Sequence, residues 1–228
     1  MRQGGRAVAS LALLVLASGA APSEHDGWGE TNAQWSGYVS QGRHFTDVST
    51  SFTVPSVSCP EPNMNASWWV GLDGFRNATV EQIGIEALCR DGVPRFSAWW
   101  QAYPAPSQPL ELPIAPGHRI TARVLVGPAG VRFELRDDTA RAAFRKTVRV
   151  PGAEFTSAEV IAEQSGASQG PLTAFGEMEF DHAMVDGEVL GRTDPLVIVM
   201  TDASGSPRVA VGPLGADGDA FTVKWLAA

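Results

Sequence analysis

Short stretches of alternating apolar and polar residues, separated by turn residues, run through most of this sequence. Residues 131–136 alternate Val, Phe and Leu with Arg and Glu, the two-residue period of a strand with one buried face. Residues 118–126 and 221–226 follow the same period. No segment of ten or more residues carries the apolar stripe of an amphipathic helix, and residues 136–146 come nearest to one. The pattern predicts an all-β protein.

Turn-forming residues separate the expected strands. The clearest signals are Asp91-Gly92, Ala115-Pro116-Gly117, Pro128-Ala129-Gly130, Asp186-Gly187 and Asp217-Gly218. Short strands with such turns are typical of a β-sandwich or barrel. No linker, repeat or low-complexity segment divides the chain after its first residues, so we expect one domain.

The N-terminus has the pattern of a secretory signal. Arg2 and Arg6 lead into an apolar run, and small residues follow it. The run is too short to span a bilayer, because a span needs about 20 apolar residues. We therefore expect a signal peptide over residues 1–21, a short leader over 22–34 and the β domain over 35–228. The exported part is expected to be extracellular.

Charge and cysteine content narrow the function classes. Loss of Arg2 and Arg6 would change the formal net charge from −8 to −10, which argues against nucleic acid and anionic membranes as partners. In an oxidising compartment Cys59 and Cys89 are first interpreted as a disulfide, with a free thiol as the alternative. The chain has no CxxC or HExxH motif and its four histidines are scattered, so we expect no metal site.

Three segments place polar and aromatic residues on a face opposite an apolar one. In residues 67–74, Trp69, Gly71 and Asp73 oppose an apolar set, which suits a groove floor with a gap at the glycine. In residues 79–86, Gln82 and Glu86 point away from two isoleucines. In residues 98–104, Trp99, Gln101 and Tyr103 share a face.

A fourth segment, residues 157–164, puts Glu159, Ile161 and Glu163 on one face. Spacing by itself does not identify which acid has a function. Periodicity alone would leave all of these polar residues as solvated strand positions.

Several motifs in a fixed order resemble the glutamic peptidases, or eqolisins. They are residues 69–74 (WVGLDG), 82–84 (QIG), 98–104 (AWWQAYP) and 158–163 (AEVIAE), with 34–38 and 45–56 upstream and 221–225 at the end. The resemblance covers almost all of the chain after residue 34. It implies a single-domain sandwich of two large antiparallel sheets, similar to concanavalin and other lectins. It also implies a secreted acid endopeptidase that is a monomer, needs no cofactor and acts on polypeptides.

The resemblance also assigns residues by position. Gln82 and Glu163 match the catalytic glutamine and glutamate. Trp35, Trp69, Asp73 and Trp99 match positions that line the substrate groove, and Gln101 lies among them. Cys59 and Cys89 stand where bacterial members of the family place a pair of cysteines, which favours the disulfide.

Three positions depart from the family. Gln101 replaces a glutamate, Ser97 replaces an aspartate, and Val160 replaces an aromatic residue. If the missing carboxylates orient the catalytic pair, activity is weakened or shifted in pH.

The expected chemistry needs no covalent intermediate. The Glu163 carboxylate would take a proton from water and return it to the leaving amine, while Gln82 would hold the water and donate N–H to the oxyanion. Two alternatives belong to other classes: a secreted module that stacks sugar rings on Trp35, Trp69, Trp99 and Tyr103, and an inactive relative that binds peptidases. Ser168 lies in a GxSxG pattern, but without the strand–turn–helix context that a serine nucleophile needs.

Overall fold

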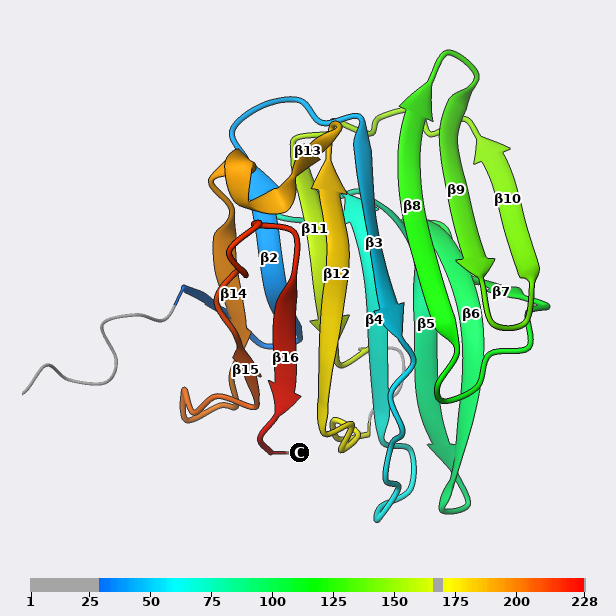
Figure 1. Cartoon of the computed structure of the whole chain (residues 1–228), viewed down its shortest axis with the longest axis vertical. Coiled ribbons are helices and arrows are strands. Elements are labelled where there is room, and N and C mark those ends of the chain that lie inside the picture. The colour runs from blue at the N-terminus through cyan, green and yellow to red at the C-terminus, as the bar shows by residue number, and fades with distance from the viewer. Residues whose placement is uncertain (1–28, 166–169, 228) are drawn as a thin grey trace, which may run out of the picture.

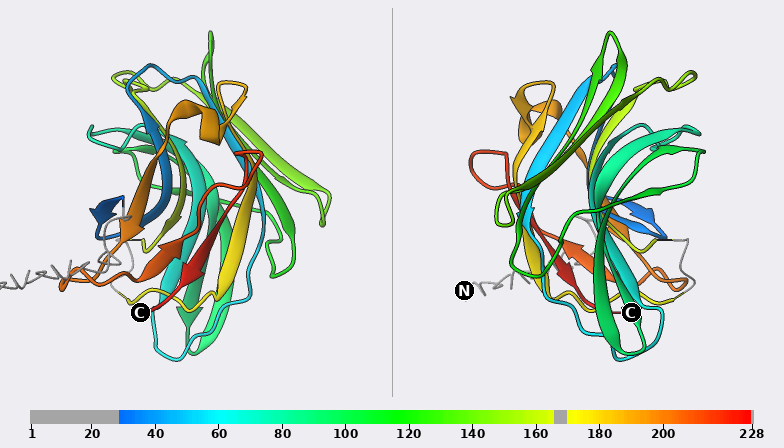
Figure 2. Two further views of the ribbon diagram at one scale, coloured as in Figure 1. Left: turned by 60° about the vertical axis from the view of Figure 1, so that its left-hand side comes forward. Right: turned by 90° about the vertical axis from the view of Figure 1, so that its right-hand side faces the viewer.

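The computed structural model describes residues 29–165 and 170–227, which form two large β-sheets facing each other (Figures 1 and 2). Within these residues, helix is limited to one 3-10 turn, η1 (Leu190–Thr193). The expected all-β sandwich is confirmed.

The first sheet, sheet A, carries the candidate site. Its strands in spatial order are β1 (Glu30–Asn32), β14 (Leu196–Met200), β2 (Trp35–Gln41), β11 (Ser157–Glu163), β4 (Asn65–Leu72), β5 (Val80–Arg90), β6 (Val93–Tyr103) and β7 (Gln108–Leu110). Strand β1 lies in the segment expected to be a leader. Because Glu30 pairs with Ile198 at the sheet edge, the folded domain begins before Trp35.

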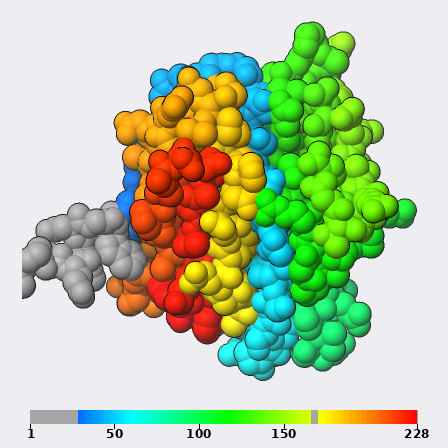
Figure 3. Space-filling view, in the orientation of Figure 1, coloured from blue at the N-terminus to red at the C-terminus, as the bar shows by residue number. Residues whose placement is uncertain are grey.

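The second sheet, sheet B, covers the other side of the core. Its strands in spatial order are β10 (Ala142–Val148), β9 (Gly130–Asp137), β8 (Arg119–Gly127), β3 (Asp47–Thr53), β12 (Glu177–Val185), β16 (Phe221–Trp225) and β15 (Val209–Val211), and β13 (Glu188–Val189) pairs with β12. Figure 3 shows its outer surface, where β12, β3 and β8 lie side by side. The three strands predicted from alternation are β8, β9 and β16. Residues 136–146 belong to the β9–β10 hairpin and form no helix.

Chain reversals occur at predicted turn positions. Asp91 and Gly92 join β5 to β6 with φ of 53° and 75°, and Asp186 and Gly187 join β12 to β13 with φ of 51° and 81°. Positive φ at both central residues is the geometry of tight hairpin turns, which Asp-Gly adopts readily.

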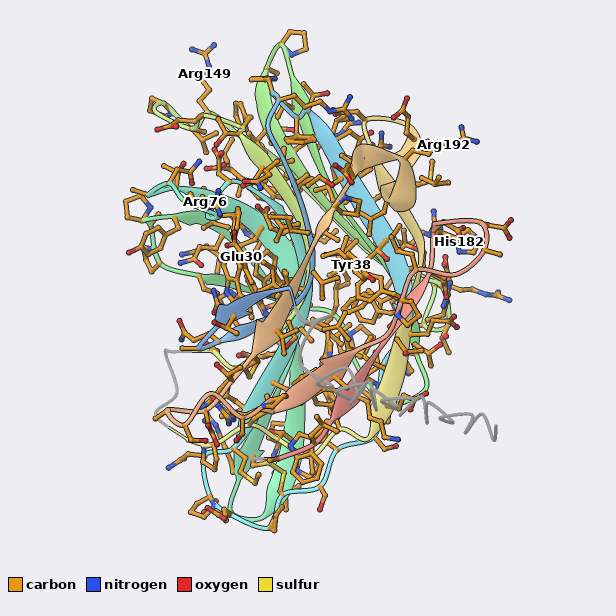
Figure 4. The ribbon with its side chains drawn as sticks, turned by 90° about the vertical axis from the view of Figure 1, so that its left-hand side faces the viewer. Glu30, Tyr38, Arg76, Arg149, His182 and Arg192 are labelled. Carbon is orange, nitrogen blue, oxygen red and sulfur yellow. A yellow bond between two sulfur atoms is a disulfide. The ribbon has the colours of Figure 1, made fainter. Side chains whose placement is uncertain are left out.

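The core lies between the sheets. Trp68, Val70 and Leu72 of β4 are fully buried there, as their alternation predicted. Tyr38 of β2, labelled in Figure 4, reaches across to sheet B and packs edge-on against Phe221, with ring centroids 4.7 Å apart.

One covalent link ties the β3–β4 connection to the end of β5. Cys59 and Cys89 form a disulfide with Cα atoms 5.5 Å apart, so the predicted pairing is confirmed. The 30-residue separation means that the bond restricts a sizeable loop of the unfolded chain.

Replacing both cysteines by serine should lower the free energy of unfolding by about 3–4 kcal/mol, because the unfolded chain regains the entropy of that loop. Urea unfolding monitored by tryptophan fluorescence measures the change. Wild-type protein in reductant should unfold at the same midpoint as the double variant. Equal stability of the oxidised wild type and the double variant would contradict the prediction.

Candidate active site

The face of sheet A turned away from sheet B brings the candidate residues together in three rows. From β11 across β4 and β5 to β6, the rows are Glu163–Ser67–Glu86–Ser97, Ile161–Trp69–Gly84–Trp99 and Glu159–Gly71–Gln82–Gln101. Strand alternation directs all of these side chains to one face. Ile83 and Ile85 lie in the core on the opposite face, as predicted.

The tryptophans form a packed floor on this outer face. Trp69 stands in the central row and meets Trp35 edge-on, with ring centroids 5.0 Å apart. Trp99 and Phe75 belong to the same apolar cluster. Trp69 is 0% exposed and Trp99 is 8% exposed, so these rings are not the open groove lining that was expected. The expectation placed them on the correct face but at the wrong depth.

Two glycines make room for this floor. A Cβ on Gly71 would lie 2.9 Å from the Cζ3 atom of Trp69, and a Cβ on Gly84 would lie 2.3 Å from the carbonyl oxygen of Trp68. The glycine at position 71 therefore accommodates the indole of Trp69. The gap expected at this glycine in the groove floor is filled by that ring.

Glu163 ends β11 at the edge of the floor. The Trp69 Nε1–H donates a hydrogen bond of 2.8 Å to its Oε2 atom. Burial raises the pKa of Glu163 to about 7, although hydrogen bonds from Trp69 and Trp35 lower it. A carboxyl with this pKa keeps its proton in acid.

Gln82 lies on β5 and is held by one neighbour. Its Nε2–H donates a hydrogen bond of 2.9 Å to Oε1 of Gln101. Its own Oε1 is buried and has no hydrogen-bond partner among the described residues. A buried unpaired oxygen costs about 1–3 kcal/mol, so the arrangement is suited to accepting a hydrogen bond from a ligand or water.

Glu163 and Gln82 share a face but are offset in register. Two strand spacings and four residues separate their Cα atoms by roughly 16 Å in a flat sheet. Each side chain can extend roughly 5 Å at ordinary bond lengths. The remaining span is at least roughly 6 Å, because side chains stand roughly perpendicular to a sheet and a hydrogen bond holds the Gln82 amide toward Gln101 on β6. Trp69 lies at the midpoint of this diagonal.

Asp73 has a different position from the one expected. It is fully buried just beyond β4 and accepts backbone N–H bonds of 2.7–2.8 Å from Glu154, Phe155 and Thr156, and one from the Asn77 side chain. Burial raises its pKa, but these hydrogen bonds outweigh burial and hold the pKa of Asp73 below its ordinary value. Asp73 therefore fastens two loops together and does not line a groove.

The burial of two further acids, Glu81 and Glu159, was not predicted from the sequence. Glu81 is 1% exposed, and its burial, followed by the charge of Asp73, raises its pKa to about 8. Glu159 is 0% exposed, and burial raises its pKa well above the ordinary value. Glu81, Ile83 and Ile85 are two residues apart along β5 and therefore share the core face. This alternation could have predicted that Glu81 points inward.

The departures from the family differ in their consequences. Ser97 donates a hydrogen bond of 2.8 Å from its Oγ to Glu86, on the same face as the candidate pair. Val160 is fully buried on the core side of β11, so that replacement does not reach the candidate site.

Other expected features are placed as follows. Ser168 lies outside the described residues. Among residues 29–165 and 170–227, no group of three or more His, Cys, Asp or Glu side chains is arranged to hold a metal ion. A cavity of about 580 Å³ opens beside Glu81, Trp100 and Tyr103, and its lining includes neither member of the candidate pair.

Comparisons with known proteins agree with this architecture. The model of the Peptidase A4 family matches residues 33–206. Aspergillopepsin-2 of Aspergillus niger is 28% identical, over 86% of this chain and 79% of that protein. Aspergilloglutamic peptidase of the same organism superposes with a TM-score of 0.62 at 26% identity, covering 72% of this chain and 99% of the other. Scytalido-glutamic peptidase, solved with a transition state analog inhibitor, has a similar fold, with a TM-score of 0.73 at 22% identity and coverage of 85% and 98%.

Glu81 should make stability depend on pH. Its pKa of about 8 in the folded chain exceeds the ordinary 4.5, so the folded state binds this proton more tightly. The stabilisation is complete below about pH 4.5 and is lost as the pH rises to about 8, with a slope of up to about 1.4 kcal/mol per pH unit. Glu81→Gln should flatten this dependence in urea unfolding.

Glu61→Gln, at an exposed loop position, provides the control for the same chemical change. It should retain the wild-type pH dependence. Identical slopes for Glu81→Gln and wild type would show that Glu81 does not hold its proton in the folded state.

Proposed function

Since the chain belongs to the Peptidase A4 family of glutamic endopeptidases, we propose that it is a secreted acid endopeptidase in which Glu163 and Gln82 activate water. Family membership makes the chain a peptidase with polypeptide substrates. The observation that carries the finer assignment is the presence, on one face of sheet A, of a carboxyl of raised pKa and of an amide oxygen without a partner among the described residues.

The raised pKa changes the starting protonation state of Glu163. The sequence-based expectation began with a carboxylate acting as base. In acid this carboxyl holds its proton, because burial disfavours its charged form. Because Trp69 donates to Oε2, the proposal places the proton on Oε1. Glu163 can then donate one proton and accept another in the same step.

The proposed addition step balances protons within the site. Water attacks the scissile carbonyl carbon while Glu163 gives its proton to the carbonyl oxygen and its other oxygen takes one from the water. The product is a neutral gem-diol. The Oε1 of Gln82 accepts a hydrogen bond from the attacking water, and the amide hydrogen not bound to Gln101 is free to donate to the oxygen that gains charge.

Breakdown of the gem-diol reverses the proton flow. Glu163 donates its proton to the departing nitrogen as the C–N bond breaks, and a hydroxyl of the diol returns a proton to the carboxyl. The products are a carboxylic acid and an amine, and Glu163 is protonated again. No bond forms between enzyme and substrate.

The proposal of secretion rests on the N-terminal segment and the disulfide. Residues 1–21 have the signal pattern, and structural disulfides persist in oxidising compartments. In residues 29–165 and 170–227 no helix has the length and apolar character needed to cross a membrane. We further propose that the chain works as a monomer without nucleic-acid or membrane partners, given its acidic net charge.

The sugar-binding alternative has less support than the peptidase. It needs an exposed aromatic platform, whereas Trp69 and Trp99 are buried in the floor of the face and only Tyr103, at 48% exposure, is freely accessible among the aromatic residues of β6. The inactive-relative alternative predicts no cleavage at any pH.

Loss of either member of the pair should abolish most turnover. Gln82→Ala removes the water acceptor and an oxyanion donor and should lower kcat by about a hundredfold or more. Glu163→Gln removes the proton carrier and should reduce kcat at least as much. Digestion of a peptide library in acid, analysed by mass spectrometry, measures both effects.

Two variants control for this experiment. Ser168→Ala should cleave at the wild-type rate, because no serine nucleophile takes part. Glu177→Gln repeats the chemical change of Glu163→Gln at an exposed position of sheet B and should also be unaffected. Wild-type rates in Gln82→Ala or Glu163→Gln would refute the assignment.

The pH profile tests the protonated form of Glu163. Activity should be present in acid and fall as the pH rises through about 7, where the carboxyl loses its proton. Initial rates on a substrate without ionisable side chains measure the profile. A maximum at or above neutrality would contradict the proposed starting state.

A further inference from the structure

Gln101 makes a two-step hydrogen-bond relay next to the candidate pair. Its Oε1 accepts the bond of 2.9 Å from Nε2 of Gln82, and its own Nε2–H donates a bond of 2.9 Å to the carbonyl oxygen of Ala105. That carbonyl lies in the turn after β6, where the N–H of Ala105 bonds back to Ala102. One amide thus uses its acceptor toward β5 and its donor toward the turn.

We propose that Gln101 is a positioning residue that fixes the orientation of the Gln82 amide and, being an amide itself, does so independently of pH. The proposal rests on the function proposed above for Gln82. It also replaces the sequence-based expectation that Gln101 contacts substrate.

The relay decides which end of the Gln82 amide is available. Ala105 can offer only a carbonyl oxygen, so Gln101 must direct its NH2 group there and its oxygen toward β5. Gln82 must then direct its NH2 group toward Gln101. Its oxygen is left buried and unpartnered, which is the orientation needed to hold the attacking water.

A glutamate at position 101 could serve both partners only while protonated. The N–H of Gln82 needs an acceptor, and the carbonyl of Ala105 needs a donor. A carboxylic acid supplies both, whereas a carboxylate supplies acceptors alone and would oppose the Ala105 oxygen. The glutamine side chain has no proton to lose in this pH range, so the relay persists as the pH rises. The structure therefore assigns to Gln101 a second effect, which is to extend the pH range of activity upward.

The test compares kcat, KM and their pH dependence in three proteins. Gln101→Leu removes the relay and should lower kcat about tenfold at every pH with little change in KM. Gln101→Glu should match wild type in strong acid and lose kcat as the pH rises past about 4.3, the ordinary pKa of a glutamate side chain. The pH at which kcat falls should therefore be lower in Gln101→Glu than in wild type, where the titration of Glu163 sets it.

Gln108→Glu is the matched control. Gln108 is exposed on β7, and its Nε2–H donates to the Pro106 carbonyl oxygen in the same turn, but no bond joins it to Gln82. Gln108→Glu adds the same charge as Gln101→Glu, so a general electrostatic effect would shift the pH profiles of both variants alike. The proposal expects Gln108→Glu to follow wild type. Coincident profiles for Gln101→Glu and either wild type or Gln108→Glu would overturn it.

A measurement without substrate separates this proposal from the proposed function. Between about pH 3 and 6, below the titration of Glu163, the side-chain amide NMR signals of Gln82, identified by their loss in Gln82→Ala, should be independent of pH in wild type and should titrate in Gln101→Glu. If wild type cleaves nothing, the proposed function fails, and these signals still decide whether Gln101 orients the amide. Signals that are unchanged in Gln101→Leu would overturn the positioning role.

Discussion

The hydrogen-bond register of sheet A is the constraint on which the candidate site depends. It sets Glu163, Trp69 and Gln82 on one diagonal across β11, β4 and β5. A slip of one residue in β11 would turn Glu163 toward the core and Ala162 outward, because side chains alternate between faces. The apolar side of each strand, buried against sheet B, makes such a slip costly. The core therefore determines the geometry of a site that lies outside it.

Burial acts on several acids in the same direction. The pKa values of Glu163, Glu81 and Glu159 are all raised by loss of solvent, whereas Asp73 keeps a low pKa because backbone N–H groups surround it. Sheet A therefore favours protonated carboxyls at three positions and one fixed negative charge. Protonation of these carboxyls stabilises the fold as the pH falls, which agrees with the acid chemistry that we propose.

The tryptophan floor links packing to chemistry. Trp69 is buried among apolar neighbours, yet its Nε1–H is directed at Glu163, so one ring both excludes water and orients the carboxyl. Gly71 and Gly84 are needed because the indole and the β4 backbone occupy the space of their missing side chains. The same burial removes the aromatic platform that a sugar-binding module would require.

Sequence alone determined the fold class, the faces of the strands, the positions of tight turns and the order of the family motifs. These follow from local properties: the two-residue period of a strand, the backbone preferences of Asp-Gly and the identity of residues in short motifs. Alternation correctly separated Trp68 from Trp69 and Gln82 from Ile83, because neighbouring residues in a strand must point to opposite faces.

Tertiary structure decided depth, partners and protonation. Alternation could not reveal that Trp69 and Asp73 are covered, that β1 joins the sheet, or that Gln101 holds Gln82, because each depends on chain segments distant in sequence. The pKa of Glu163 depends likewise on burial by the folded chain, which raises it, and on hydrogen bonds from Trp69 and Trp35, which lower it. A residue's face is a property of its own strand, whereas its burial and hydrogen bonds are properties of whatever the fold brings next to it.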